Sequence, residues 1–152
     1  DYENMMSQKA QQIVQVIPKE YSLDVKLKSP KIYFDGNVSN LGEQITNSSV
    51  FSALKECLED NYSSTFVDSK IESDIMLKVV VSTEQRSKRL GNNYPYFVYA
   101  TGSISVINNK TSEEVLNSVF KDSKGADFNL KEKAGLNALK KLSQNMNIDI
   151  CN

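Results

Sequence analysis

Histidine is absent from this sequence of 152 residues. Its absence removes the commonest general base of enzymes and the commonest side-chain ligand of transition metals. Glycine is scarce, with six scattered residues, so the sequence lacks the closely spaced glycines that cradle phosphate groups. We therefore predict no catalytic site, no cofactor and no metal site, and we expect that the protein is not an enzyme.

Long hydrophobic runs and an excess of basic residues are also missing. The longest apolar stretches, such as Val79–Val81, have the length of a strand rather than the roughly 20 residues that cross a bilayer. The formal net charge of −1 argues against nucleic acid as the main partner, since proteins that bind nucleic acid usually carry a clear basic excess. We expect no transmembrane helix and a single domain over residues 1–152.

The chain has only two cysteines, Cys57 and Cys151, and they do not form a C-x-x-C pair. A zinc site or a thioredoxin-like site is therefore disfavoured. In an oxidising compartment the two cysteines can form a disulfide that ties the C-terminus to the helix that carries Cys57. In a reducing compartment Cys57 would be a small buried apolar residue, and Cys151 would be a thiol at a frayed chain end.

The apolar residues that are present predict three helices. Amphipathic patterns indicate a helix over residues 1–18 and another over about 48–61. A third helix is predicted after Asn129, which would act as its N-cap, with Glu132 completing a capping box. Small residues along its apolar stripe, such as Ala138, would let this helix lie close to a sheet.

The segments between these helices read as strands. Alternating polarity predicts a half-exposed strand at residues 23–27, and extended structure over 31–34 that ends in a turn at Asp35–Gly36. Further extended segments follow at residues 65–67, at 73–81 as a central strand, and in a hairpin that turns at 108–111. The expected fold class is α+β, a mixed and mostly antiparallel sheet with helices packed on one face.

Three motifs in the second half resemble those of a group of bacterial envelope proteins. The stretch Asp74–Leu77 is similar to a strand entry in that group, Ser103–Leu116 to its hairpin, and Gly125–Leu139 to its closing alanine-spaced helix. The group contains periplasmic or lipid-anchored domains of the curli-secretion-channel type, penicillin-binding-protein activators, flagellar-assembly lipoproteins and the amino-terminal domain of the translocation protein TolB.

This resemblance implies an α+β unit over residues 31–147 and a role without chemistry of its own. Such a protein would act in the assembly, secretion or regulation of envelope machinery, by contact with another envelope protein or by self-association. The resemblance further implies a periplasmic or outer-membrane-anchored location, with an export signal already removed and a lipid anchor upstream of residue 1.

The loop before the hairpin is the best candidate for binding, because it interleaves cations with aromatic rings. The residues concerned are Arg86, Lys88, Arg89, Tyr94, Tyr96 and Phe97. Such mixtures occur in protein hot spots and in surfaces that bind nucleic acid. Three interpretations stay open: a solvated loop tip, a surface for a partner protein, and a nucleic-acid or nucleotide-binding module. A further alternative is a hydrolase built on acidic residues such as Asp122 and Asp127, which would need two carboxylates held around a substrate.

Overall fold

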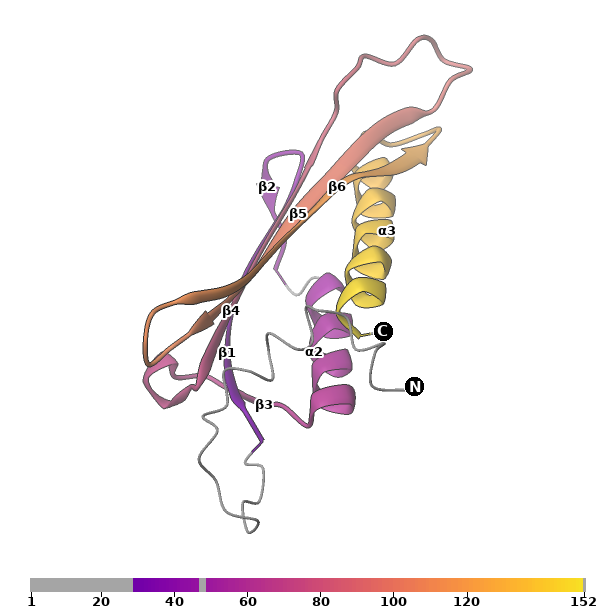
Figure 1. Cartoon of the computed structure of the whole chain (residues 1–152). Helices are drawn as coiled ribbons and strands as arrows, with labels where there is room; N and C mark the ends of the chain where they lie inside the picture. The colour runs from indigo at the N-terminus through magenta and orange to yellow at the C-terminus, as the bar shows by residue number, and fades with distance from the viewer. Residues whose placement is uncertain (1–28, 47–48, 152) are drawn as a thin grey trace, which may run out of the picture.

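The computed structural model describes residues 29–46 and 49–151 of the chain (Figure 1). The helix expected at residues 1–18 and the strand expected at 23–27 lie outside the described residues. The described elements are β1 (Lys31–Asn40), β2 (Glu43–Gln44), α2 (Ser49–Tyr62), β3 (Thr65–Val67), the short 3-10 helix η2 (Lys70–Glu72), β4 (Ile75–Glu84), β5 (Tyr96–Asn108), β6 (Glu114–Asp127) and α3 (Lys131–Cys151).

The strands form one six-stranded sheet in the order β2-β1-β4-β5-β6, with β3 also paired to β1. β1 runs parallel to β3 and β4, and the other neighbouring strands are antiparallel. β4 is therefore a central strand, as its apolar run predicts. Helices α2 and α3 lie on the same side of the sheet (Figure 1). The predicted α+β class, with helices on one face of a mixed sheet, is confirmed.

The core lies between the sheet and the two helices. Alternate residues of a strand point to opposite faces, so every second side chain of a strand faces the helices. In β4, Leu77 and Val79 are buried toward the helices, whereas Lys78 and Val80 are exposed on the other side. Besides β4, two strands and two helices contribute to the buried core cluster. The residues are Ile32 and Val38 from β1, Ala100 and Ile104 from β5, Val50 and Leu54 from α2, and Ala138, Leu139, Leu142 and Met146 from α3.

The opposite face of the sheet, called the open face below, is covered by no helix of the described chain (Figure 1). Its centre carries the small hydroxyl side chains of Ser82, Thr101 and Ser103 beside the exposed Val80. The strands place these residues on it by alternation: Lys78, Val80, Ser82 and Glu84 of β4, Phe97, Tyr99, Thr101, Ser103 and Ser105 of β5, and Asn117, Val119 and Lys124 of β6.

Helix α3 lies in backbone contact with β6 at Gly125. A Cβ atom at this position would fall on backbone atoms of Ala134 and Ala138. A polar chain adds a second link, because Thr83 Oγ1 donates to Asn40 Oδ1 at 2.6 Å and Asn40 Nδ2 donates to the carbonyl of Glu132 at 2.9 Å. These contacts hold α3 against β1, β4 and β6.

The predicted turn at Asp35–Gly36 is wrong. β1 runs through both residues, because β4 pairs alongside it from Ile32 to Ser39. The chain turns instead at Leu41 and Gly42, which have φ values of 53° and 91°.

The predicted N-cap at Asn129 is also wrong, since α3 begins at Lys131. Asp127 Oδ1 accepts the backbone N–H groups of Asn129 at 2.8 Å and Leu130 at 2.9 Å. Asp127 therefore holds the backbone just ahead of the helix, at two amide groups that lie outside α3.

The backbone contact at Gly125 leads to a test. Gly125→Ala should lower the free energy of unfolding by about 3 kcal/mol, because the added methyl group meets backbone atoms of α3 that cannot rotate away. Ala126→Val adds more volume at the next residue, which is exposed, and should cost less than about 1 kcal/mol. Urea unfolding followed by circular dichroism measures both changes. Equal unfolding midpoints for the two variants would contradict the contact.

Candidate functional site

Four side chains form a cation–aromatic cluster on the open face: Arg86, Phe97, Tyr99 and Lys124. The guanidinium carbon of Arg86 lies 4.6 Å from the centroid of the Tyr99 ring. Nζ of Lys124 lies 3.7 Å from the centroid of the Phe97 ring and 6.0 Å from that of Tyr99. Both rings are therefore within cation–π range of a basic side chain.

The strands explain how these residues meet. Phe97 and Tyr99 are two residues apart in β5, so they share a face, and Tyr99 pairs directly with Lys124 on β6. A bulge in β6 opposite Thr101 brings in Asp122, whose φ is 60°. Its carboxylate there accepts a hydrogen bond from Arg86.

The two cations of the cluster differ in how their charge is balanced. Arg86 donates from Nε to Glu84 Oε1 at 2.7 Å and from Nη1 to Asp122 Oδ1. The hydrogen bond to Glu84, and after it that to Asp122, raises the pKa of Arg86 above its ordinary value. Within the described residues no carboxylate lies in ion-pair range of Lys124. Lys124 is thus the unbalanced charge of the cluster.

Arg89 ties the loop to the start of α3 on the other side of the sheet. Its guanidinium carbon lies 4.6 Å from the centroid of the Tyr96 ring. Nε donates to the carbonyl of Tyr94 at 2.5 Å, and Nη2 donates to the carbonyls of Asn92 at 2.6 Å and Phe128 at 3.0 Å. The guanidinium of Arg89 thus donates to backbone carbonyls of the protein itself, and it holds the loop in place.

The six side chains predicted to form one binding loop therefore separate into three groups. They are Arg86 and Phe97 on the open face, Arg89 and Tyr96 on the side of the helices, and Lys88 and Tyr94 exposed in the loop. The structure does not bring them into one surface. Their use in binding stays a prediction.

Sequence reasoning missed Tyr99 and Lys124, the other half of the cluster. Tyr99 lies two residues beyond Phe97, so the period of a strand is a signal that places both rings on one face. Lys124 is 25 residues away from Tyr99 in the chain, and only the register of β5 on β6 brings it there.

The acidic residues considered for a hydrolase are held by different partners. Asp122 is bound by Arg86, and Asp127 accepts backbone N–H groups ahead of α3. The structure does not bring the two carboxylates together around a cavity. Among the residues that it describes, no group of three or more acidic or cysteine side chains is placed to hold a metal ion.

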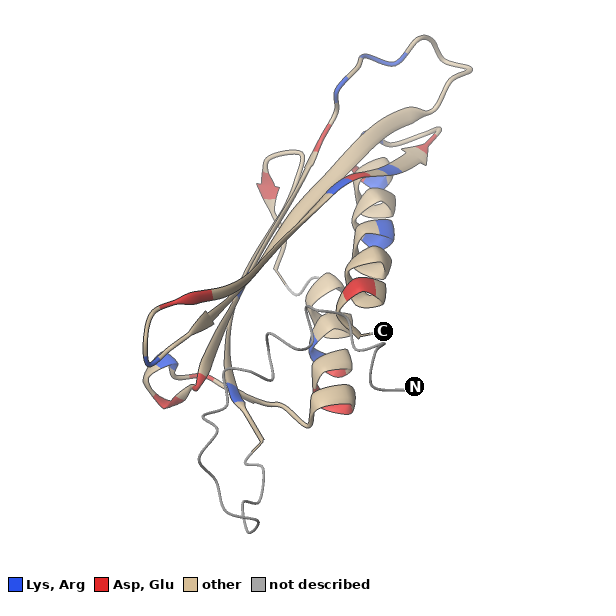
Figure 2. Ribbon diagram, in the orientation of Figure 1, with Lys and Arg blue, Asp and Glu red and all other residues tan. Residues whose placement is uncertain are grey.

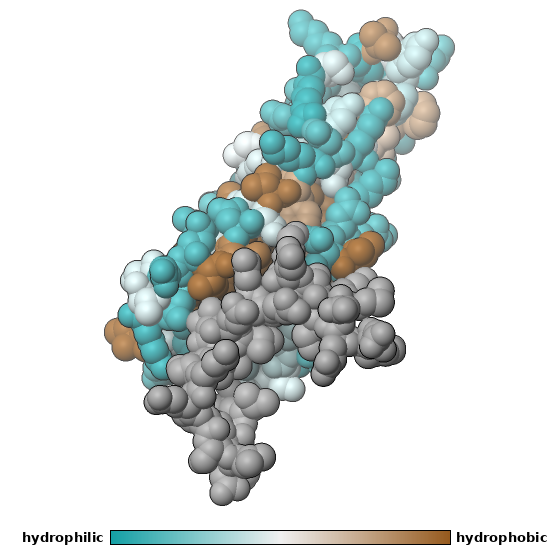
Figure 3. All heavy atoms as spheres, in the orientation of Figure 1, coloured by the Kyte–Doolittle hydropathy of each residue, from teal (hydrophilic) through white to brown (hydrophobic). Residues whose placement is uncertain are grey.

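Charge and apolar groups are spread over the surface. Basic and acidic residues are interspersed along the sheet and the helices (Figure 2). Apolar residues form separate patches within a largely hydrophilic surface in the view of Figure 3. Neither of the described α-helices combines the length and the apolar character needed to cross a bilayer.

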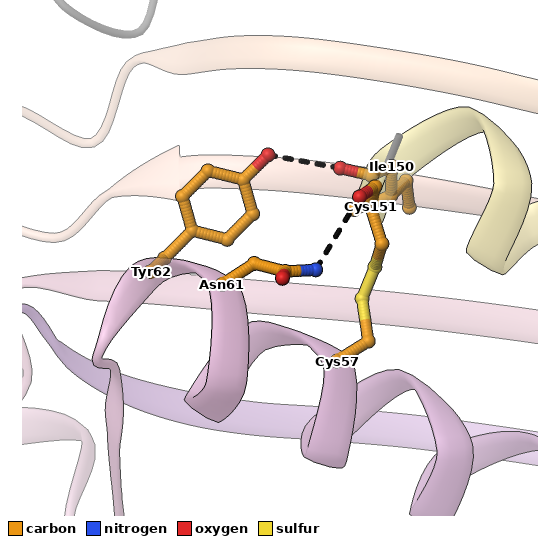
Figure 4. The surroundings of a disulfide bond; sticks show 5 residues. All are labelled: Cys57, Asn61, Tyr62, Ile150 and Cys151. Atoms are coloured by element: carbon orange, nitrogen blue, oxygen red, sulfur yellow. Dashed lines mark hydrogen bonds between the residues drawn. A yellow bond between two sulfur atoms is a disulfide. The ribbon is translucent and has the colours of Figure 1, made fainter.

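Cys57 in α2 and Cys151 at the end of α3 are joined by a disulfide (Figure 4). Their Cα atoms are 6.2 Å apart, within the range of protein disulfides. Tyr62 Oη donates to the carbonyl of Ile150 at 3.0 Å, and Asn61 Nδ2 donates to that of Cys151 at 3.3 Å. The end of α3 is thus linked to α2 by one covalent bond and two hydrogen bonds.

Reduction of this disulfide should lower the free energy of unfolding by about 4 kcal/mol. The bond closes a loop between cysteines 94 residues apart, which restricts the unfolded chain strongly. Urea unfolding with and without dithiothreitol measures the difference. The double variant Cys57→Ser/Cys151→Ser should match the reduced protein and ignore the reductant. An unfolding midpoint that is unchanged by reduction of the native chain would contradict this expectation.

Stability should also depend on the ionisation of Asp127. The backbone hydrogen bonds from Leu130 and Asn129, and then the charge of Lys133, hold the pKa of Asp127 below its ordinary value of 3.8. Because the folded pKa is depressed, the stabilisation is present above the unfolded pKa and is lost as pH falls through the folded value. Asp127→Asn should therefore flatten the loss of melting temperature below pH 3.8.

A suitable control for Asp127→Asn is Asp149→Asn, which removes an exposed carboxylate late in α3. Its melting temperature should fall with pH as steeply as that of the native chain. Identical slopes for all three proteins would remove Asp127 from the acid response.

No protein-family model matches the sequence, and no curated protein matches it. Solved structures that are similar to the chain include an uncharacterized lipoprotein B from Nitrosomonas europaea, at 12% identity and a TM-score of 0.42, with 86% of this chain and 84% of that chain covered. The C-terminal domain of LpoB from Salmonella enterica matches at 11% identity and a TM-score of 0.39, over 65% of this chain and 87% of that one. PelC from Paraburkholderia phytofirmans, a dodecamer, matches at 14% identity and a TM-score of 0.41, with 76% of this chain and 87% of that chain covered.

One of these structures is described as a lipoprotein, and lipoproteins are part of the group of bacterial envelope proteins that the sequence motifs resemble. At TM-scores below 0.5 these likenesses carry no weight in the assignment of function. That assignment rests on the geometry of the chain itself.

Proposed function

We propose that this chain is a non-enzymatic interaction domain of the bacterial cell envelope, which binds a partner protein through the open face of its sheet. The observation that carries the proposal is the cation–aromatic cluster of Arg86, Phe97, Tyr99 and Lys124. Its side chains lie on a face that no helix of the described chain covers.

The composition of the cluster supports a protein partner. Aromatic residues and arginine are enriched among the residues that dominate binding energy at protein interfaces. Tyr99 and Phe97 are half-buried and project from a strand of a six-stranded sheet, so little conformational entropy would be lost when a partner covers them. Lys124 offers a charge without a described carboxylate partner, which suits an acidic residue on the partner.

The same geometry weighs against the nucleic-acid alternative. Phosphate binding uses arginine donors, but Arg86 already donates to two carboxylates and Arg89 to three backbone carbonyls. The formal net charge of −1 also argues against nucleic acid as the partner.

The disulfide between Cys57 and Cys151 supports the envelope location. Such bonds persist in oxidising compartments, among them the bacterial periplasm, and are rare in the cytosol. We therefore place this domain on the periplasmic side of the envelope. The open face would act there as a contact surface in the assembly or regulation of envelope machinery.

Site-specific photocrosslinking of the full chain in its native periplasm tests this proposal. A photoreactive residue in place of Ser103, at the centre of the open face, should capture one protein, whereas one in place of Lys141 on α3 should not. Lys124→Glu should reduce the capture from position 103 by about tenfold, a loss of about 1.4 kcal/mol. Lys141→Glu, an equal change of charge on the helix side, should leave the capture unchanged.

The size of the captured species distinguishes the partners. A second copy of the chain doubles the mass and indicates self-association, whereas a different mass indicates another envelope protein. Melting curves confirm that each variant is folded. Equal capture from both positions, or capture that ignores Lys124→Glu, would refute the open face as the interface.

A further inference from the structure

The outer edge of β1 is paired at its two ends and left without a described partner between them. β3 pairs with Lys31–Tyr33, and β2 pairs with Ser39–Asn40. Ile45 also donates its backbone N–H to the carbonyl of Val38 at 2.8 Å. Among the described strands, none pairs with Phe34–Asn37 on this side, while β4 pairs along the other side (Figure 1). The edge therefore has a gap between β2 and β3.

A groove of about 710 Å³ lies beside this gap. β1 forms its floor, and its walls are the segment from Gln44 to Thr46 and the first turns of α2. The apolar part of the lining includes Phe34 and Phe51, whose rings meet edge to face with centroids 4.9 Å apart. Gly36 lies beneath both rings, since a Cβ atom at that position would meet each of them. The groove thus has an aromatic wall next to a strand edge.

Lys55 supplies the charge of the groove. Its Nζ lies 4.6 Å from the centroid of the Phe34 ring and 5.4 Å from that of Phe66. Among the described residues, no Asp or Glu lines the groove and no carboxylate lies in ion-pair range of Lys55. A negative group that enters the groove would therefore meet an unneutralised cation beside apolar rings.

We propose that this gap binds an extended segment of a partner protein, which adds a short strand to the outer edge of β1 between β2 and β3. Backbone hydrogen bonds to Phe34–Asn37 would hold the segment, as in other cases of strand addition. Because side chains alternate along a strand, one apolar side chain reaches Phe34 and Phe51 and a carboxylate reaches Lys55. The four residues of the gap span roughly 13 Å, the length of a short linear motif.

This binding site is separate from the cluster on the open face. The groove lies between β1 and α2, whereas the cluster lies on β5, β6 and the loop after β4. The inference therefore goes beyond the proposed function, and neither depends on the other. A test of one leaves the other standing.

Nuclear magnetic resonance of the full chain with peptide mixtures tests the proposal. The probes are two mixtures of N-acetylated hexapeptides that alternate an apolar residue with either glutamate or lysine. The glutamate mixture should shift the amide signals of Phe34–Asn37 and of Phe51 and Lys55. It should also slow hydrogen exchange of those β1 amides that do not bond to β4. The lysine mixture should leave these signals in place.

Lys55→Glu should weaken binding of the glutamate peptides about tenfold, whereas Lys140→Glu, a charge reversal on exposed α3, should not. Proline at the centre of the peptides removes a backbone N–H and should abolish the exchange protection. Equal shifts from both mixtures, or none from either, would overturn the proposal. So would slow exchange of the outward amides of Phe34–Asn37 in the free chain, because the edge would then be occupied within the chain.

Discussion

The backbone of α3 packs directly against the sheet, and this contact organises the core. At Gly125 a helix backbone and a strand backbone touch, because neither Gly125 nor the alanines at 134 and 138 hold them apart. This approach buries Leu142 and Met146 against β4 and β5 and completes the core on one side of the sheet. With α2 and α3 both on that side, the opposite side carries no helix of the described chain.

The open face keeps a half-apolar surface in water by placing cations over its rings. Arg86 and Lys124 cover Tyr99 and Phe97, so the aromatic side chains are shielded without being sealed in a core. The centre of the face is lined by small hydroxyl side chains such as Thr101 and Ser103. The face therefore combines two half-buried rings with Lys124, which has no carboxylate in ion-pair range among the described residues.

The two long edges of the sheet, β6 and the outer side of β1, differ in how regular their backbone is. β6 carries irregularities of register at two places and exposes Lys121 and Asp122, features that prevent a strand from pairing with another chain. β1 instead has an undisturbed stretch at Phe34–Asn37 beside a groove that Phe34 and Phe51 line on one side. The contrast explains why we assign strand addition to β1 and contact between faces to the other side of the sheet.

Much of the fold could be read from local patterns. The period of two in β5, the turn after Asn108 and the amphipathic helices gave the α+β class, because these signals come from neighbours in the chain. Local reasoning failed where a distant segment competed with it. Asp35–Gly36 has the composition of a turn, but pairing with β4 keeps it extended. At the start of α3 the difference is local, because the helix begins at Lys131 and Asp127 binds the amide groups of Asn129 and Leu130 ahead of it.

The candidate site shows the same difference between local sequence signals and contacts made by distant segments. Cations and aromatic rings are interleaved around residues 86–97, and two cysteines are available for one bond; both facts can be read directly from the order of residues. Which of these groups meet depends on how the strands and helices pack. Alternation in β5 sends Tyr96 and Phe97 to opposite faces, the register of β6 brings Lys124 over Phe97, and the packing of α2 on α3 brings Cys57 to Cys151. The physical reason is that side-chain direction is local, whereas the partner it finds depends on strand register and helix packing between segments far apart in the chain.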